Sequence, residues 1–348
     1  MNKDELIFCP LGGSGEIGAN MNLYAYGPED NQKWIIVDMG VTFADDSLPG
    51  IDLIYPDPGF ILDKKNDLLG IVLTHAHEDH IGAVAHIWPK LKCKIYATPF
   101  TATLLIEKFK EKKIDIVSHL KIVALNSKIK LGHFEIDFVT LTHSILEPNG
   151  LCIKTPLGTI LHTGDWKIDP NPLIGEPINE NKLKLIRNDG INAMICDSTN
   201  VFDENPSGSE SEVREVFREI FSKHKKGKII VTCFASNVAR LETILKVSED
   251  LNKLCVFVGR SIHRIYESAI ENNYLINFKN IVTEKQSKHI SDDELVLICT
   301  GSQGEHNAAL SKLIDENNKN IQLNKNELII FSSREIPGNE KKINLLKE

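Results

Sequence analysis

Short apolar runs separated by polar or glycine-rich segments recur through the first 200 residues of the chain. Such runs, when turn residues bound them, are typical of buried or half-buried strands. The pattern predicts strands at 6–11, 22–26, 34–37, 70–73, 94–97, 122–125, 135–141, 158–161 and 193–196. Amphipathic segments at 81–88 and 101–112 predict helices between them. The first part of the chain is therefore predicted to be rich in β-structure.

From about residue 203 the pattern changes to strands and helices in alternation. Ser209, with Glu212 three residues later, forms a capping box that predicts a helix running to Lys223. Further strands are predicted at 228–232, 254–258, 294–299 and 327–331, and helices at 237–251, 261–273 and 306–315. This alternation indicates a parallel sheet with helices on both faces. We expect an α/β protein of two domains, at 1–205 and 206–348.

Composition narrows the class of protein. With 348 residues, 42% hydrophobic and 25% charged, the chain has the composition of an ordinary globular protein. No apolar run has the length of a membrane span and no signal-peptide pattern opens the chain, so we expect a cytoplasmic protein without a membrane partner. The seven cysteines occur singly, which favours reduced thiols over a disulfide framework or a cysteine metal site.

The net charge of −8 would by itself argue against a polyanionic partner. Two bound divalent cations would, however, return about four positive charges. Lysine clusters also occur at 108–113 and 223–228. We favour solvated helix ends for these clusters over contact with nucleic acid, and charge alone leaves the substrate open.

Four glycines fall between Gly12 and Gly18. They mark a turn in which the backbone takes positive φ or approaches another group closely. A phosphate-binding loop is one interpretation, but the spacing does not match the common phosphate-loop motif, and a strand rather than a long helix follows. A β-hairpin is the better prediction.

The densest group of chemically active residues lies directly after the predicted strand at 70–73. His75, His77, Asp79 and His80 fall within six residues, where the backbone leaves the sheet and side chains can converge. Imidazole nitrogens and carboxylate oxygens are the ligands that zinc, and less selectively manganese, accept. One histidine would be weak evidence, but this HxHxDH pattern at a strand end predicts a metal site.

Other strand ends carry the same residue types. His143 follows the strand at 135–141, Asp165 follows the strand at 158–161, and Asp197 follows the strand at 193–196. A metal site assembled across several strands requires such spacing. Asp38 also follows the end of a strand. There it either orients a metal ligand or is an ordinary turn residue.

Several motifs together resemble the bacterial ribonuclease J family, a β-CASP branch of the metallo-β-lactamase superfamily. The matching segments are 12–21, 37–40, 50–53, 75–82, 163–165, 196–200, 234–237 and 300–305. The resemblance implies a metallo-β-lactamase αββα sandwich with a second, β-CASP α/β domain of mostly parallel sheet. It covers the whole length of the chain.

The resemblance also implies roles for individual residues. His75, His77 and His143 would bind one zinc, Asp79 and His80 the second, and Asp165 would bridge the two. Asp38 would orient the metal ligands without itself binding the metal. Asp197 would be the β-CASP acid that helps to position or protonate the reacting phosphate. Asp38, Asp79 and Asp197 are therefore the candidate catalytic residues. Ser302 and Gly301 would belong to a pocket for a terminal 5′ phosphate.

The implied activity is hydrolysis of RNA phosphodiesters in RNA processing and decay. Family members degrade RNA from a 5′-monophosphate end, cut it internally as well, and assemble as dimers or tetramers. Two divalent ions, zinc or manganese, would supply the electrostatic stabilisation. One further histidine ligand and a small C-terminal domain of the family have no counterpart up to Glu348. We therefore expect either a truncated chain or another polypeptide that provides the rest, and residues 1–348 alone should bind the second metal weakly and have little nuclease activity.

Two other functions remain open. A small-molecule hydrolase, acting on a thioester or lactam, would share the HxHxDH site but would not need the second domain. A non-catalytic RNA-binding paralogue would lose ligand residues, whereas those expected within this chain are present. RNA is preferred over DNA by the resemblance alone, because hydrolysis of either backbone needs the same metals.

Overall fold

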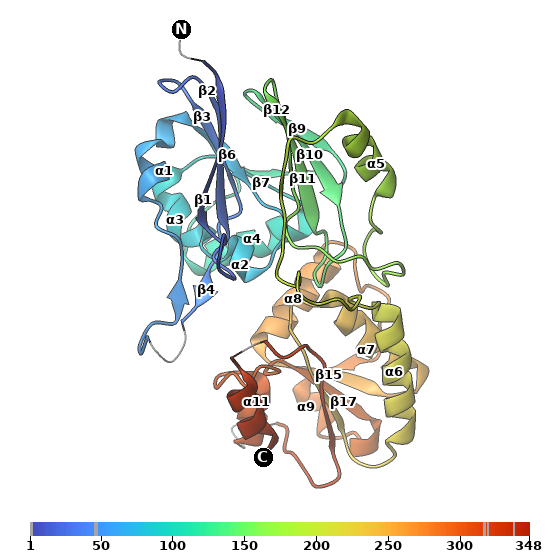
Figure 1. Cartoon of the computed structure of the whole chain (residues 1–348). Helices are drawn as coiled ribbons and strands as arrows, with labels where there is room; N and C mark the ends of the chain where they lie inside the picture. Colours follow the sequence, from blue (N-terminus) through green and yellow to red (C-terminus); the bar gives the residue numbers. More distant parts are fainter. Residues whose placement is uncertain (1–2, 45–47, 316–317, 319, 337) are drawn as a thin grey trace. The chain divides into compact units, whose positions relative to one another are not determined.

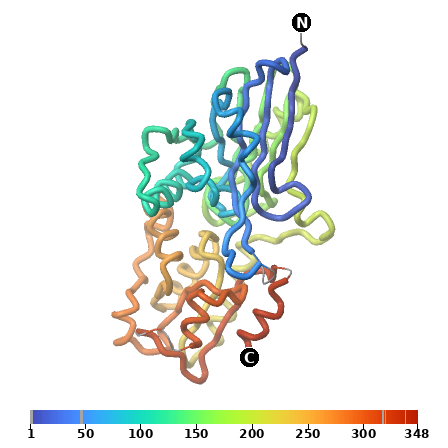
Figure 2. The backbone as a smooth tube through the Cα atoms, turned by 90° about the vertical axis from the view of Figure 1, so that its left-hand side faces the viewer, coloured from blue at the N-terminus to red at the C-terminus, as the bar shows by residue number. Residues whose placement is uncertain are grey.

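The structure is a computed structural model, which describes residues 3–44, 48–315, 318, 320–336 and 338–348. The chain forms two compact units (Figure 1). Unit 1 comprises Met1–Asp169 and Glu176–Ser207, and unit 2 comprises Pro170–Gly175 and Gly208–Glu348. The blue N-terminal strands belong to unit 1 and the red final helix to unit 2 (Figure 2).

Unit 1 contains two main sheets. The first has the strand order β1-β2-β3-β6-β7-β8. Its strands are β1 (Glu5–Gly12), β2 (Met21–Gly27), β3 (Lys33–Val37), β6 (Leu68–Val72), β7 (Ile95–Ala97) and β8 (Leu120–Ile122). The first three strands are antiparallel, and β3, β6, β7 and β8 are parallel. The glycine-rich segment is the turn of the β1–β2 hairpin, as predicted.

The second sheet has the order β13-β12-β11-β10-β9. Its strands are β9 (Lys128–Leu131), β10 (Phe134–Thr140), β11 (Asn149–Thr155), β12 (Gly158–His162) and β13 (Ala193–Ile195). Alternate residues of β10, such as Phe134, Ile136 and Phe138, face the first sheet and pack against Tyr24 and Ile35. This strict alternation gives the two sheets a shared core.

Helices cover the outer faces of the two sheets in unit 1 (Figure 1). The first sheet carries α1 (Gly59–Asp63), α2 (Glu78–Ile81), α3 (Val84–Leu91) and α4 (Pro99–Glu111), and the second carries α5 (Glu180–Asp189). Ile186 of α5 packs on Val139 and Cys152, which point away from the shared core. The predicted αββα sandwich is therefore confirmed.

The predicted helix at 81–88 is wrong in detail, because two short helices, α2 and α3, occupy this region. A continuous helix would bond the amide of Ala83 to the carbonyl of Asp79. Instead the Ala83 amide donates to Met39 O at 2.9 Å, and Asp79 O accepts from the amide of Asn20 at 3.0 Å. Tertiary hydrogen bonds thus break the helix beside the histidine cluster.

Other differences from the predictions lie in short or edge elements. The strand expected at 122–125 is β8, which ends at Ile122 because the chain turns at Ala124 to Ser127. The helix expected at 306–315 is limited to Ala309–Ile314. Strands β9 and β11 and helices α1 and α5 had not been predicted, nor had the small hairpin of β4 (Thr42–Phe43) and β5 (Leu53–Ile54).

Unit 2 is built on a five-stranded sheet of order β16-β15-β17-β14-β18 in which every pair is parallel, as predicted. Its strands are β14 (Ile229–Thr232), β15 (Leu254–Val258), β16 (Ile281–Val282), β17 (Leu295–Cys299) and β18 (Leu328–Phe331). The helices are α6 (Glu210–Lys223), α7 (Val238–Asp250), α8 (Arg260–Glu271), α9 (Glu284–Ser287), α10 (Ala309–Ile314) and α11 (Glu340–Lys347). The capping box of Ser209 and Glu212 is confirmed at the start of α6.

Candidate metal centre

The ends of four strands in unit 1 supply the side chains of one compact cluster. His75, His77 and His80 follow β6, His143 follows β10, Asp165 follows β12, and Asp38 follows β3. Strands β3 and β6 are parallel neighbours, so their carboxyl ends lie at the same edge of the first sheet. The structure thus brings together residues that are up to 127 positions apart in the sequence.

The turn that carries the histidines is held by backbone hydrogen bonds to the end of β3. The amide of Met39 donates to His80 O at 2.7 Å, and the amide of Val41 donates to Glu78 O at 3.0 Å. Between them, Gly40 lies so close to the turn that a Cβ atom there would be 1.6 Å from Asp79 O. A side chain at position 40 would push the turn away, which explains why glycine is needed there.

Three imidazoles form the first donor group. His75 Nε2 lies 3.1 Å from His77 Nδ1, and His143 Nε2 lies 3.2 Å from the same atom. The three donor atoms lie within 4.8 Å of one another. A zinc ion with bonds of about 2.0 to 2.1 Å in tetrahedral geometry separates its ligand nitrogens by about 3.3 Å. The donor set and its spacing therefore fit a divalent metal.

The second donor group consists of His75, His80 and Asp165. His80 Nε2 lies 3.2 Å from Asp165 Oδ1 and 3.5 Å from Asp79 Oδ2. The other carboxylate oxygen of Asp165 lies 3.8 Å from His143 Nε2. Asp165 therefore faces both groups, and the mixed nitrogen and oxygen donors of this second group also suit a divalent cation.

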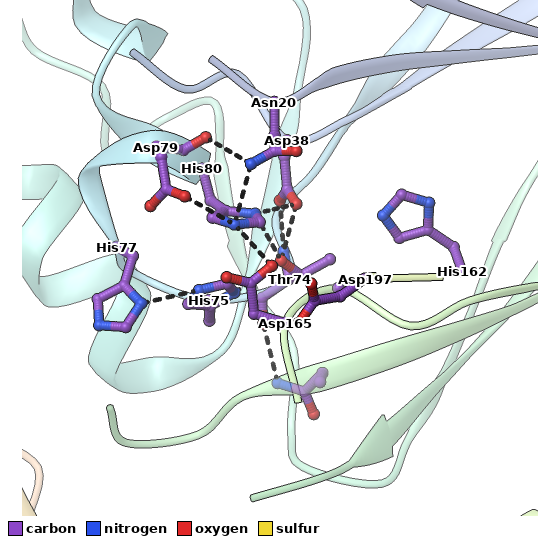
Figure 3. Close-up of polar contacts among 12 residues, drawn as sticks. Asn20, Asp38, Thr74, His75, His77, Asp79, His80, His162, Asp165 and Asp197 are labelled. Carbon is purple, nitrogen blue, oxygen red and sulfur yellow. Dashed lines mark hydrogen bonds and ion pairs between the residues drawn. The ribbon is translucent and has the colours of Figure 1, made fainter. Parts of the chain in front are cut away.

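Asp38 fixes the orientation of two histidine rings from behind (Figure 3). His80 Nδ1 donates to Asp38 Oδ2 at 2.7 Å, and the hydroxyl of Thr74 donates to the same oxygen at 2.8 Å. His75 Nδ1 in turn lies 3.0 Å from that hydroxyl. With their Nδ1 protons so engaged, His75 and His80 both present Nε2 to the cluster. Of the two interpretations left open for Asp38, the contacts favour the orienting one.

The two groups differ in their protonation. Burial lowers the pKa of His77 to about 3 and also lowers the pKa values of His75 and His143, so these rings are neutral near pH 7. Burial opposes a charge on His80 too, but the carboxylates of Asp79, Asp38 and Asp165 raise its pKa well above the usual value. The surrounding carboxylates therefore favour the protonated form of His80 in the metal-free site.

The nearby carboxylates respond in the opposite sense. Burial raises the pKa of Asp79, yet the positive charge and hydrogen bond of His80 outweigh that effect and leave the pKa below its ordinary value. The pKa of Asp165 is lowered by the same balance of burial against His80. Both carboxylates are thus ionised near neutral pH and able to act as ligands.

Asp197 and His162 lie at neighbouring strand ends of the second sheet. The Asp197 amide donates to Thr163 Oγ1 at 3.0 Å, and its carboxylate accepts from the amide of Thr199 at 2.9 Å. His162 pairs with the hydroxyl of Tyr24 at 2.8 Å, and burial lowers its pKa to about 4. Figure 3 shows His162 to one side of the cluster, joined to none of the other residues drawn.

Ser302 and Gly301 lie in unit 2, in the loop that follows β17. Ser302 is only 2% exposed, and its hydroxyl has no hydrogen-bond partner within the described part of the chain. The amide of Gln303 donates to the carboxylate of Glu305 at 3.0 Å. The loop therefore offers one buried, unpaired hydroxyl, while one of its backbone donors is already bound to a carboxylate.

Three residues that support the cluster or its turns had not been predicted. The amide side chain of Asn20 reaches Asp79 O and His80 Nε2, each at 3.2 Å. Glu147, four residues after His143, accepts from the amide of Phe100 at the start of α4. Lys108 of α4 binds Glu78 at 2.6 Å. Asn20 sits in a recognisable motif, but the contacts of Glu147 and Lys108 are tertiary and leave no local signal.

Comparison with known proteins agrees with this geometry. Residues 18–184 match the model of the metallo-beta-lactamase superfamily, and residues 226–347 match the model described as Ribonuclease J, beta-CASP domain. A Ribonuclease J of Sinorhizobium meliloti is 41% identical over 344 residues, covering 99% of this chain and 61% of that protein. The chain thus carries a metallo-β-lactamase domain and a ribonuclease J β-CASP domain, and over nearly its whole length it is similar to ribonuclease J proteins.

Two other relatives also match the chain over nearly its whole length, but over only part of their own. A Ribonuclease J of Mycolicibacterium smegmatis is 38% identical and covers 96% of this chain and 59% of its own length. One from Helicobacter pylori strain J99 is 33% identical and covers 97% of this chain and 49% of its own length. The chain thus spans about half to three fifths of the length of these ribonuclease J relatives.

A solved structure shares the fold. The crystal structure of a protein of unknown function from Enterococcus faecalis V583 matches with a TM-score of 0.55 at 15% identity, over 84% of this chain and 77% of that chain. Membership of the metallo-β-lactamase superfamily implies that the chain binds divalent metal, and the histidine cluster is consistent with this. No helix among the described residues is long and apolar enough to cross a membrane.

Proposed function

We propose that the chain is a metal-dependent ribonuclease that hydrolyses RNA phosphodiesters. The observation that carries the proposal is the pair of donor groups that share His75, because two adjacent cations are a common solution for phosphodiester hydrolysis. Similarity to ribonuclease J proteins supports RNA as the substrate. The activity would be exonucleolytic from a 5′-monophosphate end, with internal cutting as well.

The ligands of the first metal would be His75 Nε2, His77 Nδ1 and His143 Nε2. His80 and Asp79 would hold the second metal, and Asp165, which faces both groups, would bridge them. Zinc suits three imidazoles best, and manganese would suit the more oxygen-rich second group. When bound, such ions make water nucleophilic at neutral pH and neutralise charge on a phosphate.

The residues of the chain contribute orientation and proton handling. Asp38 would keep His80 Nε2 directed at the metal by accepting the Nδ1 proton, and Thr74 would do so for His75. Asp197, anchored through its backbone to Thr163, would position or protonate the phosphate at the scissile bond.

The remaining roles concern the ends of the substrate and the assembly. Ser302, with its unpaired buried hydroxyl, and Gly301, with its φ of 119°, would line a pocket for the terminal 5′ phosphate.

We place the boundary between the metallo-β-lactamase and β-CASP domains near residue 205, and the division between Ser207 and Gly208 supports this. A cytoplasmic dimer or tetramer is the expected form of the protein.

The experiment that tests the proposal measures metal content and RNA hydrolysis on the same preparation. The purified chain is stripped with a chelator, reloaded with zinc or manganese, and given a 5′-monophosphorylated, end-labelled RNA. We expect slow, metal-dependent hydrolysis that the chelator stops. Comparison with a 5′-hydroxyl RNA tests the preference for a phosphorylated end, and a model thioester tests the small-molecule alternative.

A matched pair of variants makes the result specific to the cluster. His77→Ala should abolish hydrolysis and reduce bound metal, whereas His289→Ala, an exposed histidine of unit 2, should leave both unchanged. Equal rates for the two variants would contradict the proposal. So would thioester hydrolysis without any RNA hydrolysis, or RNA binding by a fully metal-loaded chain that cuts nothing.

A further inference from the structure

Unit 1 carries a concentration of positive charge on its surface that the metal centre does not use. Between residues 90 and 121 the sequence has eight lysines and three acidic residues, in a chain of net charge −8. Helices α3 and α4 pack against each other through Trp88 and Phe109, whose ring centroids are 5.4 Å apart. Five of the eight lysines lie in these two helices or directly after them, namely Lys90, Lys92, Lys108, Lys110 and Lys112. The lysines near the ends of the two helices are thereby gathered in one region.

Two aromatic rings lie within this basic region. Tyr55, from the segment after β5, and His86 of α3 are both exposed, and their ring centroids are 5.7 Å apart with an interplanar angle of 33°. Partial burial and the nearby ammonium groups of Lys112 and Lys108 lower the pKa of His86, so its ring is neutral near pH 7. A neutral ring beside a tyrosine offers a flat face on which a base can stack.

Lysines flank the two rings on both helices. Lys90 lies four residues after His86 on α3, and Lys112 lies four residues after Lys108 at the end of α4, so each pair shares one helix face. Within the described part of the chain neither Lys90 nor Lys112 forms an ion pair. We call Tyr55, His86, Lys90, Lys108 and Lys112 the basic aromatic patch.

The patch connects directly to the metal centre. Lys108 binds both carboxylate oxygens of Glu78, at 2.6 and 2.7 Å, and Glu78 lies within the turn that carries His77 and His80. This ion pair joins the helix that carries part of the patch to the turn that carries the candidate metal ligands. Solvated lysines at helix ends would explain the charge alone, but not the pair of exposed rings among them.

We propose that the basic aromatic patch is a binding surface for single-stranded RNA next to the metal centre, with Lys90 and Lys112 on phosphates and a base stacked on Tyr55 and His86. The proposal rests on the proposed ribonuclease function and identifies a surface that holds the chain of nucleotides beyond the scissile bond. A groove of cations with aromatic rings is the usual composition of sites that bind single strands without sequence preference.

The test measures RNA binding in the metal-free chain, separately from hydrolysis. Fluorescence anisotropy with a labelled single-stranded RNA of about 20 nucleotides gives affinity as a function of salt. For the double variant Lys90→Glu/Lys112→Glu, we expect the slope of log affinity against log salt to fall by about 1.4, because each single-strand phosphate contact contributes about 0.7. Tyr55→Ala should weaken binding by about fivefold to a hundredfold, and Tyr55→Phe should not.

The matched control is Lys225→Glu/Lys226→Glu, which makes the same change in net charge at the exposed lysine cluster of unit 2. Thermal unfolding of each variant reports whether it is folded. Equal loss of binding in the two double variants would overturn the proposal in favour of non-specific attraction. Wild-type affinity in Lys90→Glu/Lys112→Glu or in Tyr55→Ala would also overturn it.

Hydrolysis by the unaltered chain separates this proposal from the proposed function. If the chain cuts RNA but the patch variants bind like the wild type, only the patch proposal fails. If the metal-loaded chain cuts no RNA while the variants lose binding as expected, the ribonuclease function fails and the surface remains an RNA-binding surface. If the unaltered chain binds no RNA, both fail.

Discussion

The two donor groups of the metal centre share His75 but carry opposite charge patterns. Around His77 one buried and two half-buried imidazoles face one another, and their lowered pKa values keep them neutral. Around His80 three carboxylates surround one ring and raise its pKa, so that it holds a proton. The first group can accept a cation as it stands, whereas the second must first release a proton. The two metal sites should therefore differ in how their metal affinity depends on pH.

The largest expected effect comes from removing a donor that only the first group uses. His143→Ala takes away Nε2 from the set around His77 and leaves His80 and its hydrogen bond to Asp38 in place. We expect RNA hydrolysis to fall by about 10³-fold, because the stabilisation supplied by one cation is worth several kcal/mol. Initial rates and metal per chain are the measurements, and a rate within about threefold of wild type would contradict the assignment.

A smaller effect, confined to the second group, is expected from Asp38→Asn. An amide oxygen could still accept from His80 Nδ1 and the Thr74 hydroxyl, which share Oδ2, but the amide NH2 would face the Thr74 N–H that donates to Oδ1 at 2.8 Å, and the negative charge beside His80 would be lost. We expect affinity at the second group to fall by about 10- to 100-fold, with the first group little changed. Metal titration measures both affinities. Asp189→Asn, at the exposed end of α5, is the control. An equal loss of metal affinity at both groups would contradict the assignment of Asp38 to the second group.

The protonation of His80 should make metal binding at the second group depend on pH, and this dependence can be measured. Because the pKa of His80 is raised, the ring is protonated near pH 7, and a metal that binds there must displace the proton. The apparent affinity of the second group should therefore fall by about tenfold for each pH unit of acidification below that pKa. The first group, already neutral, should show little dependence between about pH 6 and 8.

Calorimetric metal titration in two buffers of different ionisation enthalpy counts the protons released. We expect about one proton for the second metal and close to none for the first. His80→Gln should remove the release together with that binding step. Release of a proton on binding of the first metal would contradict the assignment of neutral rings to His75, His77 and His143.

The smallest expected effects are on stability, from removing the two contacts that join α4 to the loops carrying the candidate metal ligands. Glu147, in the loop of His143, is buried and accepts from the amide of Phe100, so Glu147→Gln should lower the free energy of unfolding by about 1 to 2 kcal/mol. Glu78, beside His77, pairs with Lys108 but its side chain is 42% exposed, so Glu78→Gln should cost at most about 1 kcal/mol. Denaturant unfolding of the metal-free chain measures both, and the reverse order would contradict this ranking.

The order and type of the main elements could be predicted from the sequence, because alternating apolar residues in strands such as β10 and the capping box of Ser209 are local signals. The break between α2 and α3 could not be predicted, because it depends on Met39 and Asn20, which lie some forty and sixty residues earlier, respectively. Short edge elements such as β4 and β9 lack a pattern long enough to detect.

The cluster itself was partly predictable for a similar reason. His75, His77, Asp79 and His80 fall within six residues of sequence, and the other candidates stand at the ends of strands that run in the same direction within each of the two sheets. The charge difference between the groups was not predictable, because it arises from how Asp38 and Asp165 face His80 in space. The contact between Glu147 and α4 likewise joins segments that no periodicity connects.

The location of bound metal tests the central claim most directly. Anomalous X-ray diffraction from crystals of the zinc-loaded chain would locate each ion. The account predicts one ion about 2.0 to 2.1 Å from His75 Nε2, His77 Nδ1 and His143 Nε2, and a second in contact with His80 Nε2 and Asp165 at neutral or higher pH. Zinc bound elsewhere, with these histidines unligated at full occupancy, would contradict it.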